Sequence, residues 1–319
     1  MGKVMLEVNN LKTKYVTRFH EDVYAVDGVS LKIEEGKSLG VAGESGCGKS
    51  TTGRTMIKLY NPTSGNVYYD GKDIFKYNHA EQKEFCKKVQ MIFQNPYSSL
   101  NPRMTVKDIV GEGLKQHGMS TKDADAKVEQ LLATVGLNKD HMSRFPHEFS
   151  GGQRQRIGIA RALSVDPEFI ICDEPISALD VSIQAQVINM LKELQEERGL
   201  TYLFIAHDLS VVKYISDRVV VMYLGTMVET AETDELYAHP MHPYTQALLS
   251  AIPEADPNKA KANQRIPIKG EIPSPINPKN CCRFAERCQH ATERCFKEMP
   301  QMKEIAPGHK VACHLVEDK

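Results

Sequence analysis

Apolar and polar residues alternate over the first part of the chain in the manner of short, half-buried β-strands. The last of these strands ends in the apolar run 39–42, which leads directly into Gly43. The segment 50–59 then has a helical pattern. The expected strands are 4–8, 24–33, 38–42, 66–70 and 89–93. The order of strand, glycine loop and helix is the feature that matters for function.

The middle of the chain alternates between amphipathic and fully apolar segments. Helices are expected at 108–117, 124–135, 151–162 and 181–198. Buried strands are expected at 169–172, 201–205 and 218–221. Strands that alternate with helices favour a parallel sheet in an α/β fold.

The composition changes after Tyr237, where eight prolines fall within about 40 residues and only 244–252 has a clear helical pattern. We therefore expect two domains, 1–237 and 238–319, with a helical subdomain at about 95–156.

Composition and charge exclude several classes of protein. The chain is 41% hydrophobic and 25% charged, with a formal net charge of −1. That balance is ordinary for a globular protein and lacks the basic excess of nucleic-acid-binding domains. Apolar runs such as 169–172 and 219–224 are far shorter than the roughly 20 residues that a membrane helix needs. Residues 1–10 lack the apolar core of a signal peptide. We expect a cytosolic protein that reaches a membrane only through other proteins.

Residues 43–50, Gly-Glu-Ser-Gly-Cys-Gly-Lys-Ser, fit the phosphate-binding pattern G-x-x-x-x-G-K-[ST] in full. The glycines let backbone N–H groups point at phosphate oxygens, and the helix that follows presents its positive end to the same anion. Lys49 would reach the β- and γ-phosphates, and Ser50 would hold Mg²⁺. The alternative is a glycine-rich turn with a chance Lys-Ser pair. The expected ATP-binding residues here are Gly43, Ser45, Gly46, Cys47, Gly48, Lys49, Ser50 and Thr51.

A second acidic site follows the apolar strand 169–172. Asp173 and Glu174 would lie at the carboxyl end of a central strand, where α/β folds place their chemistry. Asp173 would bind Mg²⁺ through water, and Glu174 would act as the general base on the attacking water. An acidic strand-to-loop junction without function is the alternative.

Ser150-Gly151-Gly152-Gln153 resembles the signature sequence of ABC ATPases. On its own this tetrapeptide could be a helix N-cap, with Ser150 accepting backbone N–H groups. The resemblance implies a P-loop NTPase core with an N-terminal antiparallel β subdomain and a helical signature subdomain.

The resemblance then assigns roles to residues that single motifs could not. Gln94 matches the glutamine loop and would bind Mg²⁺ and nucleotide, with Asp173 and Ser50 as the other magnesium ligands. Asp180 matches the D-loop, and His207 matches the switch histidine beside the γ-phosphate. Tyr15 is the expected adenine-stacking aromatic, with Phe19 and Tyr24 as competitors.

Residues outside the ATPase motifs narrow the family. Segments 93–105 and 144–161, together with His242-Pro243-Tyr244 and the Thr245-Gln246-Ala247-Leu248-Leu249 that follows, resemble the second ATPase subunit of dipeptide and oligopeptide importers. That resemblance implies peptide import. Nickel or glutathione as the solute stays an alternative. A soluble ABC ATPase in repair or translation is a further alternative, although the chain has neither the long coiled-coil insertion nor the tandem cassettes of those proteins.

The resemblance also implies a set of partners. ABC ATPases work as head-to-tail pairs, in which Ser150–Gln153 and Asp180 of one subunit would cap the nucleotide held by the other. The expected partners are a second, related ATPase, two transmembrane permease subunits and, indirectly, an extracytoplasmic peptide-binding protein. The chain would sit at the cytoplasmic face of the membrane, without nucleic acid.

Five of the eight cysteines lie within the last 39 residues. Cys282, Cys288, Cys295 and Cys313 have the spacing C-x5-C-x6-C-x17-C, with Cys281 as a neighbour. In a cytosolic protein such a cluster favours a metal site over disulfides. Four thiolates suit a [4Fe–4S] cluster, which occurs in this extension in some importers of this kind. Zinc is the alternative, bound by four Cys or by three with His290, His309 or His314.

Overall fold

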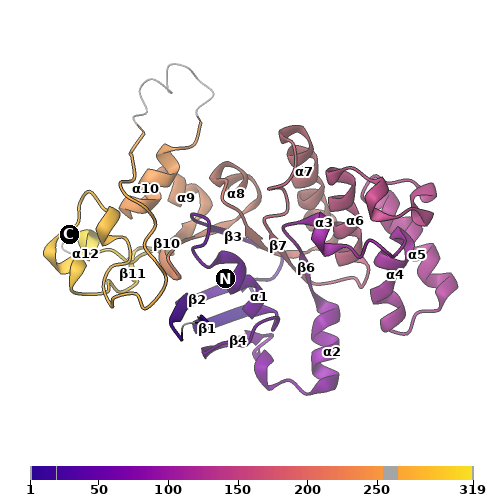
Figure 1. Cartoon of the computed structure of the whole chain (residues 1–319), viewed down its shortest axis with the longest axis horizontal. Helices are drawn as coiled ribbons and strands as arrows, with labels where there is room; N and C mark the ends of the chain where they lie inside the picture. Colours follow the sequence, from indigo (N-terminus) through magenta and orange to yellow (C-terminus); the bar gives the residue numbers. More distant parts are fainter. Residues whose placement is uncertain (1, 19, 254–264, 318–319) are drawn as a thin grey trace. The chain divides into compact units, whose positions relative to one another are not determined.

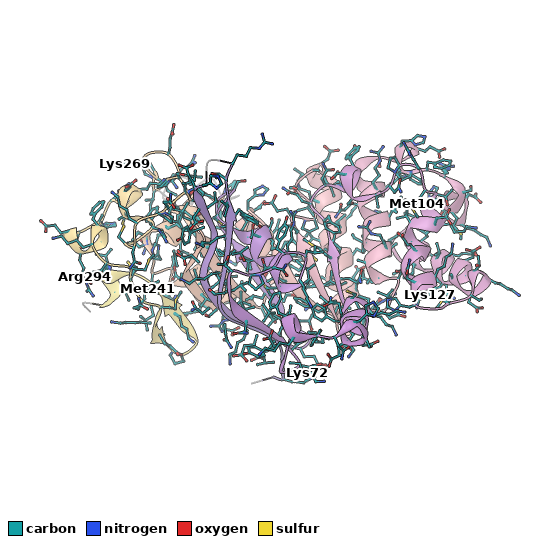
Figure 2. The ribbon with its side chains drawn as sticks, turned by 60° about the horizontal axis from the view of Figure 1, so that its bottom comes forward. Lys72, Met104, Lys127, Met241, Lys269 and Arg294 are labelled. Atoms are coloured by element: carbon teal, nitrogen blue, oxygen red, sulfur yellow. The ribbon has the colours of Figure 1, made fainter. Side chains whose placement is uncertain are left out.

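The computed structural model describes residues 2–18, 20–253 and 265–317 (Figure 1). The chain folds as two compact units. The first contains residues 1–34, 38–76 and 205–319, and the second contains 35–37 and 77–204. In Figure 2, Lys72, Met241, Lys269 and Arg294 belong to the first unit, and Met104 and Lys127 to the second.

The N-terminal strands of the first unit form an antiparallel sheet. Its order is β2 (Asp22–Glu34), β1 (Val4–Val16), β4 (Ser64–Tyr69) and β5 (Lys72–Asp73). Leu6, Val8 and Leu11 are buried along β1 while their neighbours are more exposed. The alternation seen in the sequence therefore produces this sheet, but β1 and β2 are longer than the pattern predicts.

A second sheet in the first unit carries the glycine loop. Within this unit its strand order is β11 (Lys303–Ala306), β12 (His309–Val311), β10 (Thr226–Glu232), β9 (Arg218–Tyr223) and β3 (Ser38–Ala42). Only β3 and β9 pair in parallel. All five residues of β3 are buried, as a continuous apolar run requires. The helices of this unit are α1 (Lys49–Met56), α8 (Leu209–Ile215), α9 (Thr233–Ala238), α10 (Pro243–Ser250) and α12 (His314–Glu317).

The second unit combines three strands with most of the long helices. Its strands lie in the order β8 (Thr201–Ile205, ending at the border of the units), β7 (Phe169–Asp173) and β6 (Val89–Ile92), and β6 pairs with β7 in parallel. Its helices are α2 (His79–Lys88), α3 (Pro96–Ser99), α4 (Val106–Gln116), α5 (Thr121–Thr134), α6 (Gly151–Leu163) and α7 (Val181–Arg198). Side chains such as Thr105 and Ser120 cap these helices.

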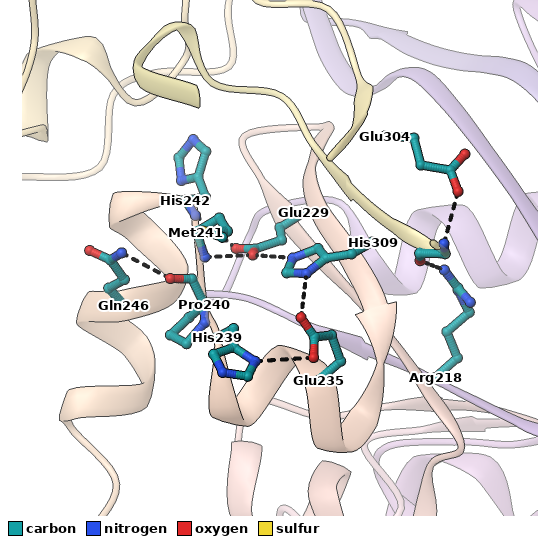
Figure 3. Close-up of polar contacts among 11 residues, drawn as sticks. Arg218, Glu229, Glu235, His239, Pro240, Met241, His242, Gln246, Glu304 and His309 are labelled. Atoms are coloured by element: carbon teal, nitrogen blue, oxygen red, sulfur yellow. Dashed lines mark hydrogen bonds and ion pairs between the residues drawn. The ribbon is translucent and has the colours of Figure 1, made fainter. Parts of the chain in front are cut away.

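The C-terminal extension adds strands to the second sheet of the first unit. Its two short 3₁₀ helices, Ala285–Arg287 and Glu293–Phe296, lie between the first cysteines of the extension and the hairpin that β11 and β12 form on β10. Figure 3 shows how the hairpin is attached: His309 Nε2 lies 2.8 Å from Glu229 Oε1, and both side chains are fully buried. The same carboxylate accepts the backbone N–H groups of Met241 and His242. The extension is thus built into this sheet.

Candidate functional site

The phosphate-binding loop joins β3 to α1, as the sequence predicts, and both the backbone conformation and the close approach of other strands require glycine at two of its positions. Gly43 and Gly48 have φ angles of 149° and 99°. A Cβ atom on Gly43 would lie 2.3 Å from the Met222 carbonyl oxygen, and one on Gly48 would lie 2.1 Å from that of Ala25. Any side chain at either position would push the loop away from the strands beneath it.

Lys49 is folded back onto its own loop. Its side chain is buried, and Nζ donates hydrogen bonds to the carbonyl oxygens of Gly43 at 2.8 Å and Glu44 at 3.0 Å. The ammonium group is therefore held at the centre of the loop, where a phosphate charge would be neutralised.

Tyr15 lies beside the first turn of α1. Burial raises the pKa of its phenol, and a hydrogen bond to the Thr51 side chain opposes that shift. The ring is 38% exposed and meets the Tyr60 ring edge-to-face at 5.9 Å between centroids. An exposed ring close to the loop suits the predicted stacking role. Tyr24 instead lies under the Lys14 ammonium, and Phe19 falls outside the described residues.

His207 reaches the same edge of the first unit as the loop. The preceding Ala206 donates its backbone N–H to the Val41 carbonyl at 3.2 Å, so His207 follows a segment aligned with the end of β3. Its side chain is exposed, and Asp208 caps the helix that begins next.

The acidic pair lies at the end of β7 in the second unit. Asp173 is fully buried, whereas Glu174 is half-buried and has φ of 45°. Gln94 Nε2 donates a hydrogen bond of 2.8 Å to Glu174 Oε2. The structure thus brings the glutamine-loop residue and the predicted base together, which motif spacing alone does not show.

The signature segment forms the start of α6. Ser150 Oγ accepts the Gln153 N–H, and Gln153 Oε1 accepts the Ser150 N–H, which completes a capping box. A Cβ atom on Gly152 would lie 2.7 Å from Ile183 Cγ2, so α6 meets the first turn of α7 closely. Asp180, the exposed N-cap of α7, therefore lies near the signature, as their shared predicted role requires.

The C-terminal cysteines gather but do not form a ready metal site. Burial, together with the neighbouring Cys295, Cys313 and Cys288, raises the pKa of Cys282 to about 12. Burial also raises the pKa of Cys313 to about 11. Within 2–18, 20–253 and 265–317, however, no group of three or more His, Cys, Asp or Glu side chains has an arrangement that could hold a metal ion. The iron–sulfur cluster predicted from the spacing is not supported by this geometry.

Two side chains from the extension reach the phosphate-binding loop, and the sequence motifs give neither of them a role there. Tyr244 Oη accepts the backbone N–H of Glu44 at 2.8 Å, and Arg287 forms an ion pair with the Glu44 carboxylate. Tyr244 and Arg287 lie 200 and 243 residues away from Glu44, so no local pattern could have indicated either contact.

Comparison with known proteins assigns the family. Residues 26–177 match the family described as ABC transporter, and residues 228–295 match the one described as Oligopeptide/dipeptide transporter, C-terminal region. The oligopeptide transport ATP-binding protein AppF of Bacillus subtilis is 57% identical over 92% of this chain and 90% of its own length. The chain belongs to the oligopeptide/dipeptide family of ABC transporter ATP-binding proteins. OppF of the same organism, an oligopeptide transport ATP-binding protein, is 54% identical over 100% of this chain and 99% of its own.

Solved ABC ATPases confirm the predicted fold of this family member. The ABC transporter cassette MJ0796, described as dimeric, is 29% identical and covers 72% of this chain and 99% of its own, with a TM-score of 0.66. The cbiO1 protein from Clostridium perfringens, part of the cbiONQ complex, is 26% identical over 74% of this chain and 92% of its own, with a TM-score of 0.65. Among the residues that the structure describes, no helix has the length and apolar character to cross a membrane.

Proposed function

We propose that this chain is the ATP-hydrolysing subunit that powers import of di- and oligopeptides through an ABC transporter. One observation carries the proposal: a single chain matches the ABC transporter family over 26–177 and the oligopeptide/dipeptide C-terminal region over 228–295. The first match supports ATP hydrolysis, and the second supports a peptide over nickel or glutathione as the solute. The predicted division at Tyr237, between the ATPase domain and the extension, remains part of this proposal.

In the proposed reaction, the loop 43–50 binds the phosphates, with Lys49 as the cation. Glu174 accepts a proton from the attacking water, and His207 contacts the γ-phosphate. Ser50, Gln94 and Asp173 would hold Mg²⁺, which supplies charge neutralisation when bound. Their oxygen donors suit this hard cation. The Gln94 amide nitrogen is engaged by Glu174, so its oxygen is the atom that would face a metal.

The proposed partners follow from the family. The capped N-terminus of α6 would face the nucleotide of a second, related ATPase, with Asp180 beside it. Two permease subunits would hold both ATPases at the cytoplasmic face of the membrane, and an extracytoplasmic binding protein would deliver the peptide. A dimeric ABC cassette among the similar structures supports the pairing.

Peptide uptake in the source cell tests the transported solute. Cells that lack this chain should lose uptake of a labelled oligopeptide, and the wild-type gene should restore it. Lys49→Ala should fail to restore it. If cells that lack the chain keep normal peptide uptake, and the wild-type gene instead restores uptake of nickel or glutathione, the transported solute is that alternative. Binding of candidate solutes to the binding protein of the same transporter gives an independent measurement.

For the extension we propose a [4Fe–4S] cluster on Cys282, Cys288, Cys295 and Cys313, with zinc as the alternative. The spacing C-x5-C-x6-C-x17-C of these cysteines supports the proposal. Binding would need the four side chains to move into a metal-binding arrangement, and Cys282, Cys288 and Cys313 to lose protons that their raised pKa values retain. Anaerobic purification should give a brown protein with about four irons per chain. One zinc in a colourless protein would favour the alternative, and five titratable thiols without metal would contradict both.

A further inference from the structure

The phosphate-binding loop contains a carboxylate that is neutralised from the C-terminal extension. Arg287 Nη1 lies 2.5 Å from Glu44 Oε2, and Nη2 lies 3.1 Å from Glu44 Oε1. The ion pair is bidentate, and the side chains of Arg287 and Glu44 are 7% and 24% exposed, respectively. Arg287 Nε also donates to the Lys269 carbonyl, and Nη1 lies 3.3 Å from the Tyr223 hydroxyl. The guanidinium is thus fixed in one orientation.

Glu44 is the point at which the extension holds the loop. Its carbonyl oxygen accepts a hydrogen bond from Lys49 Nζ, and its N–H donates to Tyr244 Oη. The Tyr244 ring packs against Tyr223 at 4.8 Å and Phe284 at 5.3 Å between centroids. Arg287 therefore acts on the same residue whose backbone helps to place the phosphate-binding lysine.

A carboxylate in this position has a clear electrostatic consequence. The loop is built to bind a polyanion, and an uncompensated negative charge on Glu44 would repel phosphate groups bound beside it. A buried, bidentate guanidinium is the side chain best suited to cancel that charge and hold its geometry. Because Arg287 pairs with the Glu44 carboxylate, that carboxylate does not neutralise Lys49. The charge of Lys49 is then directed to a bound phosphate.

We propose that Arg287 is a positioning residue for nucleoside triphosphate binding, which acts by neutralising and fixing Glu44 in the phosphate-binding loop. The proposal rests on the nucleotide-binding role of residues 43–50. It gives the C-terminal extension a direct part in the ATP site.

Substitution of Arg287 tests the proposal in the full-length chain. Arg287→Met keeps most of the side-chain volume but leaves Glu44 uncompensated, so the Kd for a fluorescent ATP analogue should rise roughly tenfold. Arg287→Lys keeps the charge but loses the two-pronged geometry, so a rise of about threefold is expected. In the assembled transporter, KM for ATP should rise while kcat changes less than twofold.

Arg283 provides the matched control. It belongs to the same extension and forms a comparably buried ion pair with Asp27, at 2.7 Å and with side chains 6% and 14% exposed. Asp27 lies on β2 rather than in the loop. Arg283→Met should lower the melting temperature to a similar degree but leave the Kd for nucleotide within twofold of wild type.

A double variant separates neutralisation from simple structural support. Glu44→Gln introduced into Arg287→Met removes the uncompensated charge, so the Kd should recover at least threefold relative to Arg287→Met. No recovery, or equal effects of Arg287→Met and Arg283→Met on Kd, would overturn the proposal. Wild-type protein that binds no nucleotide would instead refute the role of the loop, so the two failures are distinguishable.

Discussion

Glu174 has a backbone conformation that few residues with a side chain adopt. Its φ of 45° lies in the left-handed region, where L-residues other than Asn and Asp are rare. Residues held in this way persist only where the surrounding structure enforces them, and they cluster at functional sites. Here the conformation places the carboxylate beside the Gln94 amide, immediately after the buried Asp173. The strained position agrees with the proposed role as base.

We predict that Glu174→Gln retains ATP binding and loses turnover by a factor of about 10² to 10⁴, because an amide keeps the shape of the side chain but cannot accept the proton. The measurement is the ATPase rate of the assembled transporter together with the Kd for ATP.

Glu168→Gln is the control for this prediction, since Glu168 precedes the other end of β7 and pairs with Lys88 at 3.0 Å. Its ATPase rate should stay close to wild type. Near wild-type turnover in Glu174→Gln would show that another group is the base.

At the scale of elements, the hydrophobic pattern predicts buried segments best. The expected ranges 181–198 and 201–205 coincide with α7 and β8, and 169–172 falls one residue short of β7. The amphipathic pattern of α7 is bounded by the N-cap Asp180 and by Gly199 after its last turn, which leaves little choice of boundary. Motif spacing likewise predicts the loop between β3 and α1, because a glycine-rich phosphate-binding sequence requires a strand before it and a helix after it.

The strand β10 and the two strands of the extension that follow it in the sheet could not be predicted in this way. The sequence of β10, Thr-Met-Val-Glu-Thr-Ala-Glu, does not suggest a buried strand, because a glutamate such as Glu229 is normally exposed. The burial of the Glu229 carboxylate depends on its contact with His309, which lies 80 residues away. The strands β11 and β12 have four and three residues, too few to show a period. A local sequence pattern also cannot predict long-range ion pairs such as the one between Arg287 and Glu44, which are 243 residues apart.

We predict that His309→Ala destabilises the protein by about 3 kcal/mol, because it leaves the buried Glu229 carboxylate without one of its hydrogen-bond partners. The free energy of unfolding in urea measures this loss. Figure 3 also contains the control: His239 pairs with Glu235 at 3.1 Å, and its side chain is 65% exposed.

His239→Ala should cost less than about 1 kcal/mol, as expected for an exposed pair. Equal effects of the two substitutions would show that the His309 contact does not stabilise the attachment of the hairpin.

At the scale of the whole molecule, the family predicts an incomplete enzyme. In the proposed pairing, the signature of one subunit serves the nucleotide of the other, so the purified chain should be a weak ATPase and mostly monomeric. It should pair with a related, non-identical ATPase in the transporter. Light scattering with ATP, on this chain alone and with its partner, measures the pairing. A stable homodimer that drives transport without a second ATPase would contradict the prediction.

The contact between Glu229 and His309 can form only after the ribosome has synthesised both residues. The ribosome adds Glu229 of β10 80 residues before it adds His309. At about 5 to 20 residues per second, that interval is about 4 to 16 seconds. During this time β10 lacks the neighbour that will pair with its open edge, and Glu229 lacks its imidazole partner. An unpaired strand edge is a common starting point for aggregation. Nascent chains stalled before residue 309 should therefore be the forms of this protein that most need a chaperone.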